Sequence, residues 1–541
     1  MSNSKPIGKS SSPERDPNTT TKFWAWLQEG TIVNPFDFVT ADQIHDTKTV
    51  GIVSEIVAPS DAPSHLSNYV SSDFGQPEAE PYVDRLSSMV AEITVLRNDG
   101  TPEIMMPVPG DRLVHFASPK DVQFALGADQ VLGQKIPAGV IHQSNGTIVP
   151  VNVDSAYLLG PEGAHVNASG ISGLATKTSY LMFLMFSVQQ VLGKDVAFII
   201  FNVKQSDLLH LDEAADDLTE EDVGLYKQLG LKPAPFDNVT YYLPQGREGK
   251  PDSDRAPKKH LLYDYSLKDV YNRLDLLFAD VPDQYFTLDT FIQRIREDWQ
   301  HGQLIVQSSG STKGERANPK VVKTWQDLRE LPNELIVQAF NLHAITAPRI
   351  KRELTRLTGS TLFPNLRGPN EVYLGEEAKK IRSGQILVID IAQVPSRTQP
   401  FVVGDVMRSI DEIYREGKEG LPKKMAIFID ELNSIAPSGN SSAITEQVVE
   451  IARKGRSRGT ILFGAEQFKS EIHEQIVGNS SLHVIGRTGS AEVRKSAYAF
   501  LDDKSKQNVM NLSKGEIVIS TPTWRSPIKI RFPRPPYKKL R

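Results

Sequence analysis

From about residue 160 onward, apolar residues gather in short continuous runs. These runs are VAFIIFNVK, GQILVIDIA, KMAIFIDEL, TILFGAEQ, HVIGRTG and EIVISTP; the helical segment TKTSYLMFLMFSVQQVL precedes the first run, and VVGDVMRSIDEIYREG lies between the second and the third. A strand that is apolar on both sides is buried on both faces, and helices between such strands are typical of a parallel sheet. The pattern predicts an α/β core with a parallel-rich sheet, built from residues 156–204 and 380–523.

Residues 46–155 show a different, β-rich pattern. The runs TVGIVSEIV, AEITVLRNDG and DRLVHFAS are separated by turn signals such as Asn98-Asp99-Gly100 and Pro109-Gly110-Asp111. Short strands at this spacing predict a small β-barrel or sandwich, with an irregular β-rich lobe as the alternative. Residues 2–22 are polar and have no apolar core of a signal peptide, so we expect residues 1–45 to form a disordered or extended tail.

Residues 205–379 interrupt the alternation of strands and helices. Stretches such as TLDTFIQRIREDWQ and PRIKRELTRL have helical spacing, so a mostly helical insertion is predicted. The stretch Asp207–Asp222 holds eight acidic residues and no Lys or Arg. A solvated surface is the favoured interpretation of this stretch, and a docking site for a basic partner is the alternative.

Composition narrows the functional classes. The chain has 541 residues, of which 39% are hydrophobic, and a formal net charge of −5, which argues against a protein that coats nucleic acid by bulk charge but leaves room for a local basic channel. There are no cysteines, which excludes disulfides, thiolate metal sites and Cys nucleophiles and suits a cytoplasmic location. The longest uncharged apolar stretch, Thr178–Gly193, is shorter than the ~20 residues of a membrane span, so no membrane partner is expected.

The first candidate for chemistry is the segment GISGLATKTSY, which follows a short predicted strand and opens a helix. Backbone N–H groups at such a turn face an anion, and the usual phosphate-loop pattern is G-x-x-x-x-G-K-[ST]. Lys177 and Thr178 match this pattern, whereas Ile171 and Thr176 stand where its glycines belong. A strand–helix turn with a chance lysine is the alternative. The residues expected to contact phosphate are Gly170, Ser172, Gly173, Leu174, Ala175, Thr176, Lys177, Thr178 and Ser179.

The second candidate is MAIFIDEL, an apolar strand that ends in Asp430 and Glu431. At the carboxyl edge of a sheet, Asp430 can hold Mg²⁺ through water and Glu431 can polarise the attacking water. By itself, such a strand is equally compatible with acids that favour the start of an exposed helix. The phosphate loop followed by the acidic strand, with strands between them, favours a nucleoside triphosphatase that uses ATP and Mg²⁺.

The third candidate is ARKGRSRGTILFGAEQ. Gln467 ends its apolar strand and is predicted to sense the γ-phosphate and orient water. Arg453, Arg456 and Arg458 are candidates to reach the nucleotide of a neighbouring subunit, with Arg456 the first choice and Arg487 a further candidate. An arginine supplied in this way stabilises the charge that develops in phosphoryl transfer. The alternative is that these arginines face solvent or line a DNA channel.

The C-terminal segment is basic. From Arg525 to Arg541 there are seven basic residues and no acids, and four prolines among residues 527–536 prevent a helix. We expect residues 524–541 to form an extended arm over a neighbouring subunit or on DNA, with a disordered tail as the alternative.

The order of segments along the chain resembles the HerA branch of the HerA–FtsK superfamily of hexameric P-loop motor ATPases. These segments are a β-rich N-terminal lobe, HVNASGISGLATKTS, FNVKQSDLL, a helical insertion, IFIDELN and ARKGRSRGTILFGAEQ. The resemblance covers about residues 46–540, and it is to the bacterial, defence-associated type. It implies a RecA-like P-loop core, a small N-terminal barrel called the HAS barrel, a homo-hexameric ring around DNA and ATP at the subunit interfaces.

The resemblance also implies roles for residues and partners. Lys177 would contact the β- and γ-phosphates, Thr178 would ligate Mg²⁺, Asp430 would support the metal and Glu431 would activate water. Partners of the family are effector proteins: archaeal relatives work with the NurA nuclease in DNA-end resection, and bacterial relatives pair with Sir2-type or DUF4297-type proteins in anti-phage defence.

Three functions remain open at this point. The first is a DNA-translocating or helicase-like ATPase that activates a partner nuclease or NADase. The second is a nucleotide-binding hexameric scaffold with little turnover, because Thr176 adds a side chain to a tight turn. The third is a DNA-end helicase that works with a partner nuclease in repair.

Overall fold

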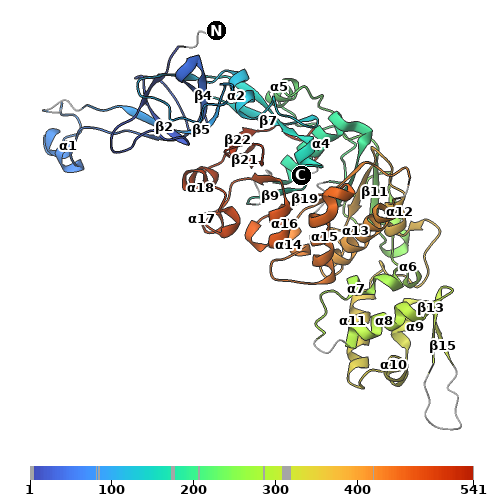
Figure 1. Cartoon of the computed structure of the whole chain (residues 1–541). Helices are drawn as coiled ribbons and strands as arrows, with labels where there is room; N and C mark the ends of the chain where they lie inside the picture. Colours follow the sequence, from blue (N-terminus) through green and yellow to red (C-terminus); the bar gives the residue numbers. More distant parts are fainter. Residues whose placement is uncertain are drawn as a thin grey trace. The chain divides into compact units, whose positions relative to one another are not determined.

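The computed structural model describes residues 5–80, 82, 86–171, 177–204, 208–283, 287–307, 319–417 and 419–539 (Figure 1). The chain forms two compact units. The first unit contains Met1–Asp154, Gly224–Gly230 and His483–Pro533, and the second contains Ser155–Val223, Leu231–Leu482 and Arg534–Arg541. Both units are therefore assembled from segments that are far apart in the sequence.

A closed six-stranded barrel opens the first unit. Its strands are antiparallel and follow the order β1-β2-β5-β4-β3-β6. They are β1 (Gly8–Ser11), β2 (Lys22–Leu27), β3 (Phe38–Asp42), β4 (Lys48–Val57), β5 (Met89–Asn98) and β6 (Leu113–Phe116), with the short helices α1 (His65–Ser71) and α2 (Pro119–Ala125) in the connections. The predicted N-terminal barrel is confirmed.

The boundaries of this barrel differ from the prediction. Three of its strands come from residues 8–42, which we expected to be a tail. In β2 the sequence KFWAWL alternates, and Phe23 and Ala25 are fully buried while their neighbours point away from the barrel core. Polar residues also find partners here, because the hydroxyl of the buried Ser10 donates to the carbonyl of Pro109 at 2.6 Å. These strands were not predicted because the segment is rich in Ser and Thr, and because strands from distant segments complete its hydrogen bonding.

Residues 135–154, expected in the barrel, belong to another group of strands in the first unit. These strands pair antiparallel in the order β20-β21-β22-β7-β8. The strands are β7 (Lys135–His142), β8 (Ile148–Asp154), β20 (Leu482–Ile485), β21 (Glu516–Ser520) and β22 (Ile528–Arg531); α17 (Ser490–Val493) and α18 (Asp503–Met510) follow β20. β7 and β8 form a hairpin, and the other partner of β7 is β22, which lies more than 380 residues later, so sequence order gave no sign of this pairing.

Eight parallel strands form the core of the second unit, in the order β16-β12-β11-β17-β10-β18-β19-β9. They are β9 (Val166–Ser169), β10 (Val196–Asn202), β11 (Val239–Pro244), β12 (Leu261–Tyr263), β16 (Glu371–Val372), β17 (Ile386–Asp390), β18 (Lys424–Ile429) and β19 (Thr460–Glu466). Every residue of β10, β17 and β19 is buried. The predicted parallel sheet, covered on both faces, is confirmed for these strands. The runs HVIGRTG and EIVISTP, which were also expected in it, form the antiparallel strands β20 and β21 instead.

Helices cover both faces of this sheet (Figure 1). On one face, α4 (Lys177–Leu192) packs against β9, β10 and β19. On the other face, α13 (Gln399–Glu416) and α15 (Ala443–Arg458) share a core with Ala197, Ile199 and Phe201 of β10. Smaller helices, α3 (Ser155–Leu158), α14 (Leu432–Ile435) and α16 (Glu474–Asn479), lie in the connections. Within the described residues, no helix combines the length and apolar character that crossing a membrane requires.

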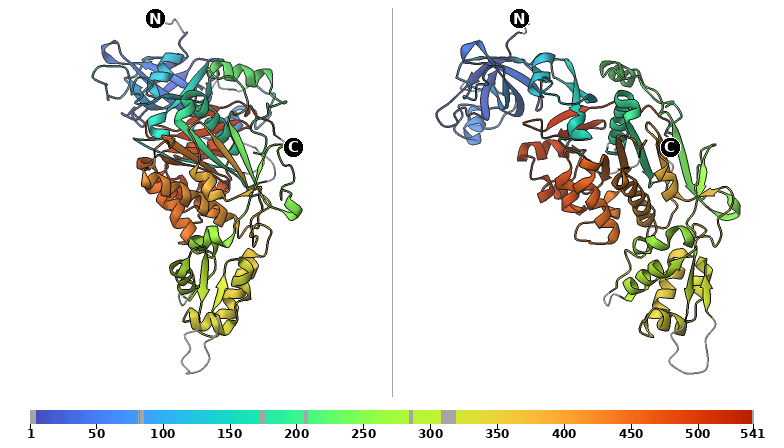
Figure 2. Two further views of the ribbon diagram at one scale, coloured as in Figure 1. Left: turned by 90° about the vertical axis from the view of Figure 1, so that its right-hand side faces the viewer. Right: turned by 45° about the vertical axis from the view of Figure 1, so that its right-hand side comes forward.

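The insertion at 205–379 is only partly helical. Its strands β11, β12 and β16 extend the parallel sheet, which corrects the prediction of a mostly helical segment. β12 has three residues and β16 has two, which is too short for a clear strand signal in the sequence. The described residues between 267 and 358 form a lobe of helices with a three-stranded sheet, coloured green to yellow in Figure 2. Its elements are α6 (Leu267–Val270), α7 (Leu274–Leu277), α8 (Thr287–Asp298), β13 (Trp299–Gln300), β14 (Gln303–Val306), β15 (Lys320–Val322), α9 (Trp325–Glu330), α10 (Asn333–Ala339) and α11 (Thr346–Thr358), followed by α12 (Leu374–Lys379).

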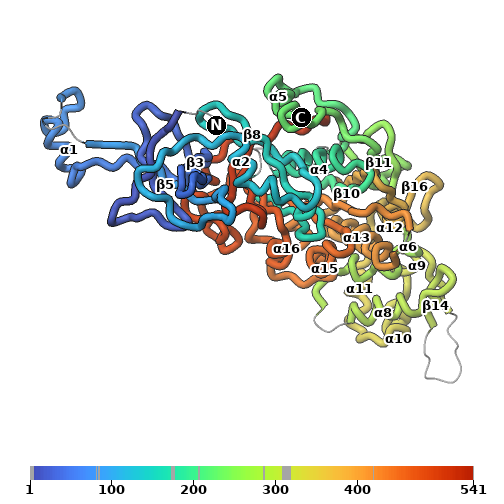
Figure 3. Tube along the Cα trace, turned by 45° about the horizontal axis from the view of Figure 1, so that its top comes forward, coloured from blue at the N-terminus to red at the C-terminus, as the bar shows by residue number. Residues whose placement is uncertain are grey.

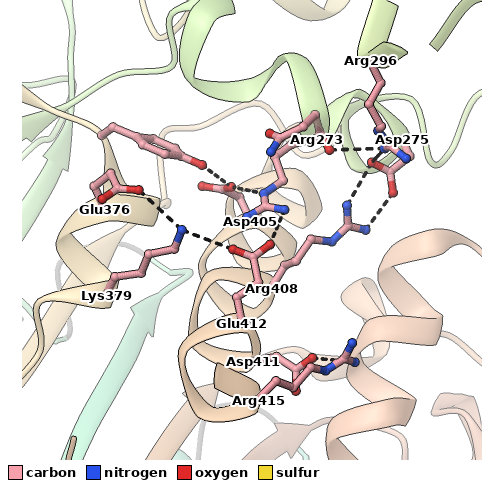
Figure 4. Close-up of polar contacts among 12 residues, drawn as sticks. Arg273, Asp275, Arg296, Glu376, Lys379, Asp405, Arg408, Asp411, Glu412 and Arg415 are labelled. Carbon is pink, nitrogen blue, oxygen red and sulfur yellow. Dashed lines mark hydrogen bonds and ion pairs between the residues drawn. The ribbon is translucent and has the colours of Figure 1, made fainter. Parts of the chain in front are cut away.

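A network of charged residues joins this insertion to α13 (Figure 4). Arg273 lies 2.6 Å from Glu412 and 3.4 Å from Asp405, whose carboxylate also accepts the Tyr373 hydroxyl at 2.7 Å. Arg408 forms two hydrogen bonds to Asp275, at 2.9 and 2.7 Å. Asp405 is fully buried, so burial raises its pKa to about 6, against the opposing influence of Arg273. The network pairs its charges across the contact between the insertion and α13.

Candidate functional site

The carboxyl ends of β9, β19 and β18 meet at one edge of the second unit's sheet, with β19 in the middle. Gly170 directly follows β9, Gln467 directly follows β19, and Asp430 directly follows β18. Because parallel strands end at the same edge, the fold brings three segments predicted from separate motifs to one place.

The first turn of α4 contacts the acidic pair. Lys177 is 5% exposed, and its Nζ lies 3.3 Å from Glu431 Oε1 and 3.9 Å from Asp430 Oδ1. The hydroxyl of Thr178 donates to Asp430 Oδ2 at 3.0 Å. These contacts join residues more than 250 positions apart, which the sequence alone only suggested. Residues 172–176, the remainder of the predicted phosphate loop, lie outside the described residues.

Glu431 has a strained backbone. It adopts a left-handed conformation with φ of 52°, and its N–H donates to Asp430 Oδ1 at 2.9 Å. A non-glycine residue in this region costs on the order of 1–3 kcal/mol and persists only where its surroundings enforce it. Such residues concentrate at functional sites.

Lys204, which follows β10, makes a second ion pair with Glu431. Both lysines contact the same oxygen, Oε1. Burial by itself would raise the pKa of Glu431, but Lys204 and Lys177 outweigh burial and hold this pKa below its usual value. Glu431 is therefore ionised at neutral pH, and the contacts among the described residues that fix it use Oε1 and leave Oε2 for water.

A buried polar group lies behind this edge. Glu466, the last residue of β19, is fully buried, and within the described part of the chain neither of its carboxylate oxygens has a hydrogen-bond partner. Burial raises the pKa of Glu466 well above its usual range, although Lys469 and Lys177 act in the opposite direction. Lys469 is also fully buried, which lowers its pKa to about 8. Burial therefore favours the uncharged forms of both side chains at this edge of the sheet.

The predicted arginines lie elsewhere. α15 runs back across the sheet, so Arg453, Arg456 and Arg458 lie near the amino end of β19, roughly 20 Å along the strand from its carboxyl end. Arg456 donates to the carbonyl of Glu162 at 3.0 Å, and Arg458 pairs with Asp411 at 2.5 Å.

Arg453 is exposed, whereas Arg487 belongs to the first unit and donates to the carbonyl of Met510 at 3.1 Å. The arginines therefore do not join the Lys177–Glu431 cluster of their own chain, and their action on a neighbouring nucleotide stays a prediction.

Two residues at this site were missed by sequence reasoning. Lys204 stands in FNVKQSDLL, where a polar segment directly after a buried strand signalled the sheet edge but gave no sign of its partner. Glu466 stands beside Gln467 at the end of an apolar strand, and only its complete burial separates it from a surface acid.

Comparisons with known proteins give distant structural likeness only. No known family model matches the sequence, and no curated protein matches it. The bacterial conjugative coupling protein TrwB has a TM-score of 0.46 and 10% identity over 79% of this chain and 95% of its own. VirB4 of Thermoanaerobacter pseudethanolicus has a TM-score of 0.45 and 14% identity over 74% of this chain and 96% of its own.

The genome packaging NTPase B204 of Sulfolobus turreted icosahedral virus 2, solved with ATP-γS, matches 29% of this chain and 72% of its own at a TM-score of 0.23 and 11% identity. Because all three TM-scores lie below 0.5, they add no weight to the geometry of the site itself.

Proposed function

We propose that the chain is a Mg²⁺-dependent ATPase of the P-loop type. The observation that carries this proposal is the convergence of Lys177 and Thr178, at the start of α4, with Asp430 and Glu431, at the end of β18. A buried ammonium at a helix N-terminus suits phosphate, and an ionised carboxylate beside it suits water activation.

The donor set fits a magnesium ion. The Thr178 hydroxyl and the Asp430 carboxylate are hard oxygen donors 3.0 Å apart, and Mg²⁺ usually binds one or two such groups together with water and phosphate oxygens. Thr178 would bind the ion directly and Asp430 through water. When bound, the ion neutralises charge on the phosphates.

Each residue of the site would then have a separate role in ATP hydrolysis. Lys177 would bind the β- and γ-phosphates, and Gln467 would orient the attacking water from the end of β19. Glu431 would accept a hydrogen bond from that water through Oε2, while Lys204 and Lys177 fix Oε1. One of the arginines Arg453, Arg456 and Arg487 would act on the nucleotide of a neighbouring subunit. Arg458 is a weaker candidate, because Asp411 and Glu450 already engage it.

We further propose a ring-forming motor on DNA that activates a partner effector, a nuclease or an NADase, in anti-phage defence. This part rests on the order of motifs that resembles the HerA family. The barrel and the parallel sheet follow the arrangement which that resemblance implies. A hexameric scaffold with little turnover and a DNA-end resection helicase are the alternatives.

The test is steady-state ATP hydrolysis by the purified chain and by its Lys177→Ala variant, each with and without duplex DNA. The mass of the assembly is measured in the same buffer to show whether the chain forms a ring. We expect a ring whose hydrolysis is stimulated by DNA and abolished by Lys177→Ala. A ring that binds ATP without turnover would support the scaffold instead. Absence of ATP binding would refute the ATPase proposal.

A further inference from the structure

The acidic segment 208–222 binds the chain's own basic C-terminal segment 534–539, and both lie in the second unit. Arg534 donates from its backbone to Asp222 at 3.0 Å and from its guanidinium to the carbonyl of Asp217 at 2.8 Å. Lys538 pairs with Glu213 at 2.9 Å. Most of the described acids of this segment are exposed, as the solvated-surface interpretation expected, and some of them also bind a basic segment of the same chain.

Backbone and aromatic contacts fix this segment as well. The N–H of Ala215 donates to the carbonyl of Pro536 at 3.0 Å, and the N–H of Lys538 donates to the carbonyl of Glu213 at 2.9 Å. Tyr537 is 1% exposed. Figure 3 shows the red C-terminal trace beside the green segment that precedes α5 (Glu220–Gln228). The arm expected over a neighbour or on DNA is, as far as Lys539, ordered on its own chain.

The docked segment reaches α4. The ring of Tyr537 lies 5.9 Å from that of Phe236, which lies 5.7 Å from Phe186 on α4. Two residues further on, Lys539 Nζ donates to the hydroxyl of Ser179 at 2.7 Å. Ser179 is in the first turn of α4, two residues after Lys177, and is 6% exposed.

This position is unusual for a cation. The amino end of a helix attracts anions and disfavours positive charge. Two ammonium groups, those of Lys177 and Lys539, nevertheless lie at the first turn of α4. An anion seated at this turn would be attracted by both of them and by the helix, which gives the arrangement a physical reason.

We propose that Lys539 contacts the phosphate chain of the nucleotide bound by its own subunit, and that the acidic segment serves to deliver it there. The inference rests on the proposed ATPase function and deepens it. Binding of segment 534–539 to the acidic segment 208–222 then contributes to nucleotide affinity, because it positions Lys539. Loss of the contacts between these two segments should therefore weaken nucleotide binding, although they do not touch the nucleotide.

The first experiment measures equilibrium binding of a fluorescent ATP analogue to the full chain. We expect Lys539→Ala to weaken binding about tenfold, in line with the loss of one charge-assisted contact, and Lys539→Arg to restore most of it. Lys514→Ala, which removes an exposed lysine of the first unit, is the matched control and leaves binding unchanged. Adenosine, which has no phosphate, should bind Lys539→Ala and the parent chain equally.

The second experiment tests delivery by the acidic segment. Lys538→Glu places like charges together and should weaken ATP binding, and adding Glu213→Lys should recover it, because the ion pair is restored in reverse. Thermal unfolding without nucleotide shows whether each variant is folded.

The outcomes separate the two proposals. If Lys539→Ala binds ATP as tightly as the parent while Lys177→Ala does not bind, the Lys539 contact is refuted and the ATPase proposal stands. If Lys539→Ala loses adenosine and ATP affinity equally, its role is structural and the inference fails. If the parent chain itself binds no ATP, both proposals fail.

Discussion

Two regions of the second unit bury ionisable side chains, and they differ in the partners that these side chains have. Around α13, the buried Asp405 and Arg273 have opposite charges beside them, and the pairing continues outward to Glu412 (Figure 4). At the sheet edge, Glu431 has a left-handed backbone, and among the described residues the buried Glu466 has no hydrogen-bond partner.

The difference indicates that the charged residues around α13 stabilise the fold, whereas those at the sheet edge are available to a ligand. A buried ion whose partners are supplied by the chain holds two elements together, and little remains for chemistry. A buried group without a close partner raises the free energy of the folded state, and such a cost is expected where a ligand or a reaction uses the group. Variants of the first region should therefore change stability, and variants of the second should change activity.

The largest expected effect is at Glu431. Glu431→Gln should lower ATP turnover by about 100-fold or more while ATP binding is retained, because the amide cannot accept the proton of water. Steady-state hydrolysis and a binding titration on the same sample measure both quantities. Glu450→Gln, which alters a paired carboxylate on α15, is the control and should hydrolyse at the parental rate. Parental turnover by Glu431→Gln would remove Glu431 from the mechanism.

The comparison predicts the reverse for Arg273. Arg273→Met leaves the buried Asp405 without its cation and should lower the free energy of unfolding by about 3–5 kcal/mol. Urea unfolding measures the loss, and adding Asp405→Asn should recover part of it. ATP affinity of the folded protein should stay unchanged. If affinity fell and stability did not, the division between the two regions would be wrong.

A smaller effect is expected at Lys204. Lys204→Ala removes one of the two cations that lower the pKa of Glu431, so this pKa should rise toward its usual value. The acid limb of the pH–rate profile should then move to higher pH, with only a few-fold change in turnover at neutral pH. Lys194→Ala, an exposed lysine at the other end of β10, is the matched control. Identical acid limbs in parent and Lys204→Ala would show that Lys204 does not tune Glu431.

The last prediction concerns Glu466. Its folded pKa is raised, so the folded state holds a proton that the unfolded state releases, and the contribution of this group is present at low pH and lost as pH rises above the ordinary value of 4.5. Glu466→Gln does not titrate.

The stability difference should therefore shift in favour of the variant as pH rises, by at most about 1.4 kcal/mol per pH unit. Urea unfolding from about pH 5 to about pH 8 measures the trend. Parallel stability curves for the two proteins would contradict it.

The sequence predicted the parts of the fold that have a strong local signal. Continuous apolar runs such as those of β10 and β18 identified the buried parallel strands, because only a strand covered on both faces tolerates them. Strands with polar or alternating residues were placed less well. β1–β3 were expected to be a tail, although later strands, β4, β5 and β6, complete their pairing. The hairpin of β7 and β8 was assigned to the barrel, although its pairing beyond the hairpin is with the distant β22.

The candidate site followed the same division. The sequence identified four site candidates and their order: Lys177, Thr178, Asp430 and Glu431. Each of them stands at the end of an apolar strand or at the start of a helix, which is a local signal. The roles assigned to Gln467 and to the arginines stay predictions.

By itself, then, the sequence determined the central strands of the parallel sheet, such as β10, β17, β18 and β19, and several of the polar residues at its carboxyl edge. Only the tertiary structure decided that Lys204 contacts Glu431, that Glu466 is fully buried, and that Lys539 reaches Ser179. The physical reason is range. Strand and helix formation depend on neighbouring residues, whereas the pairing of charges depends on which distant segments the sheet order brings together.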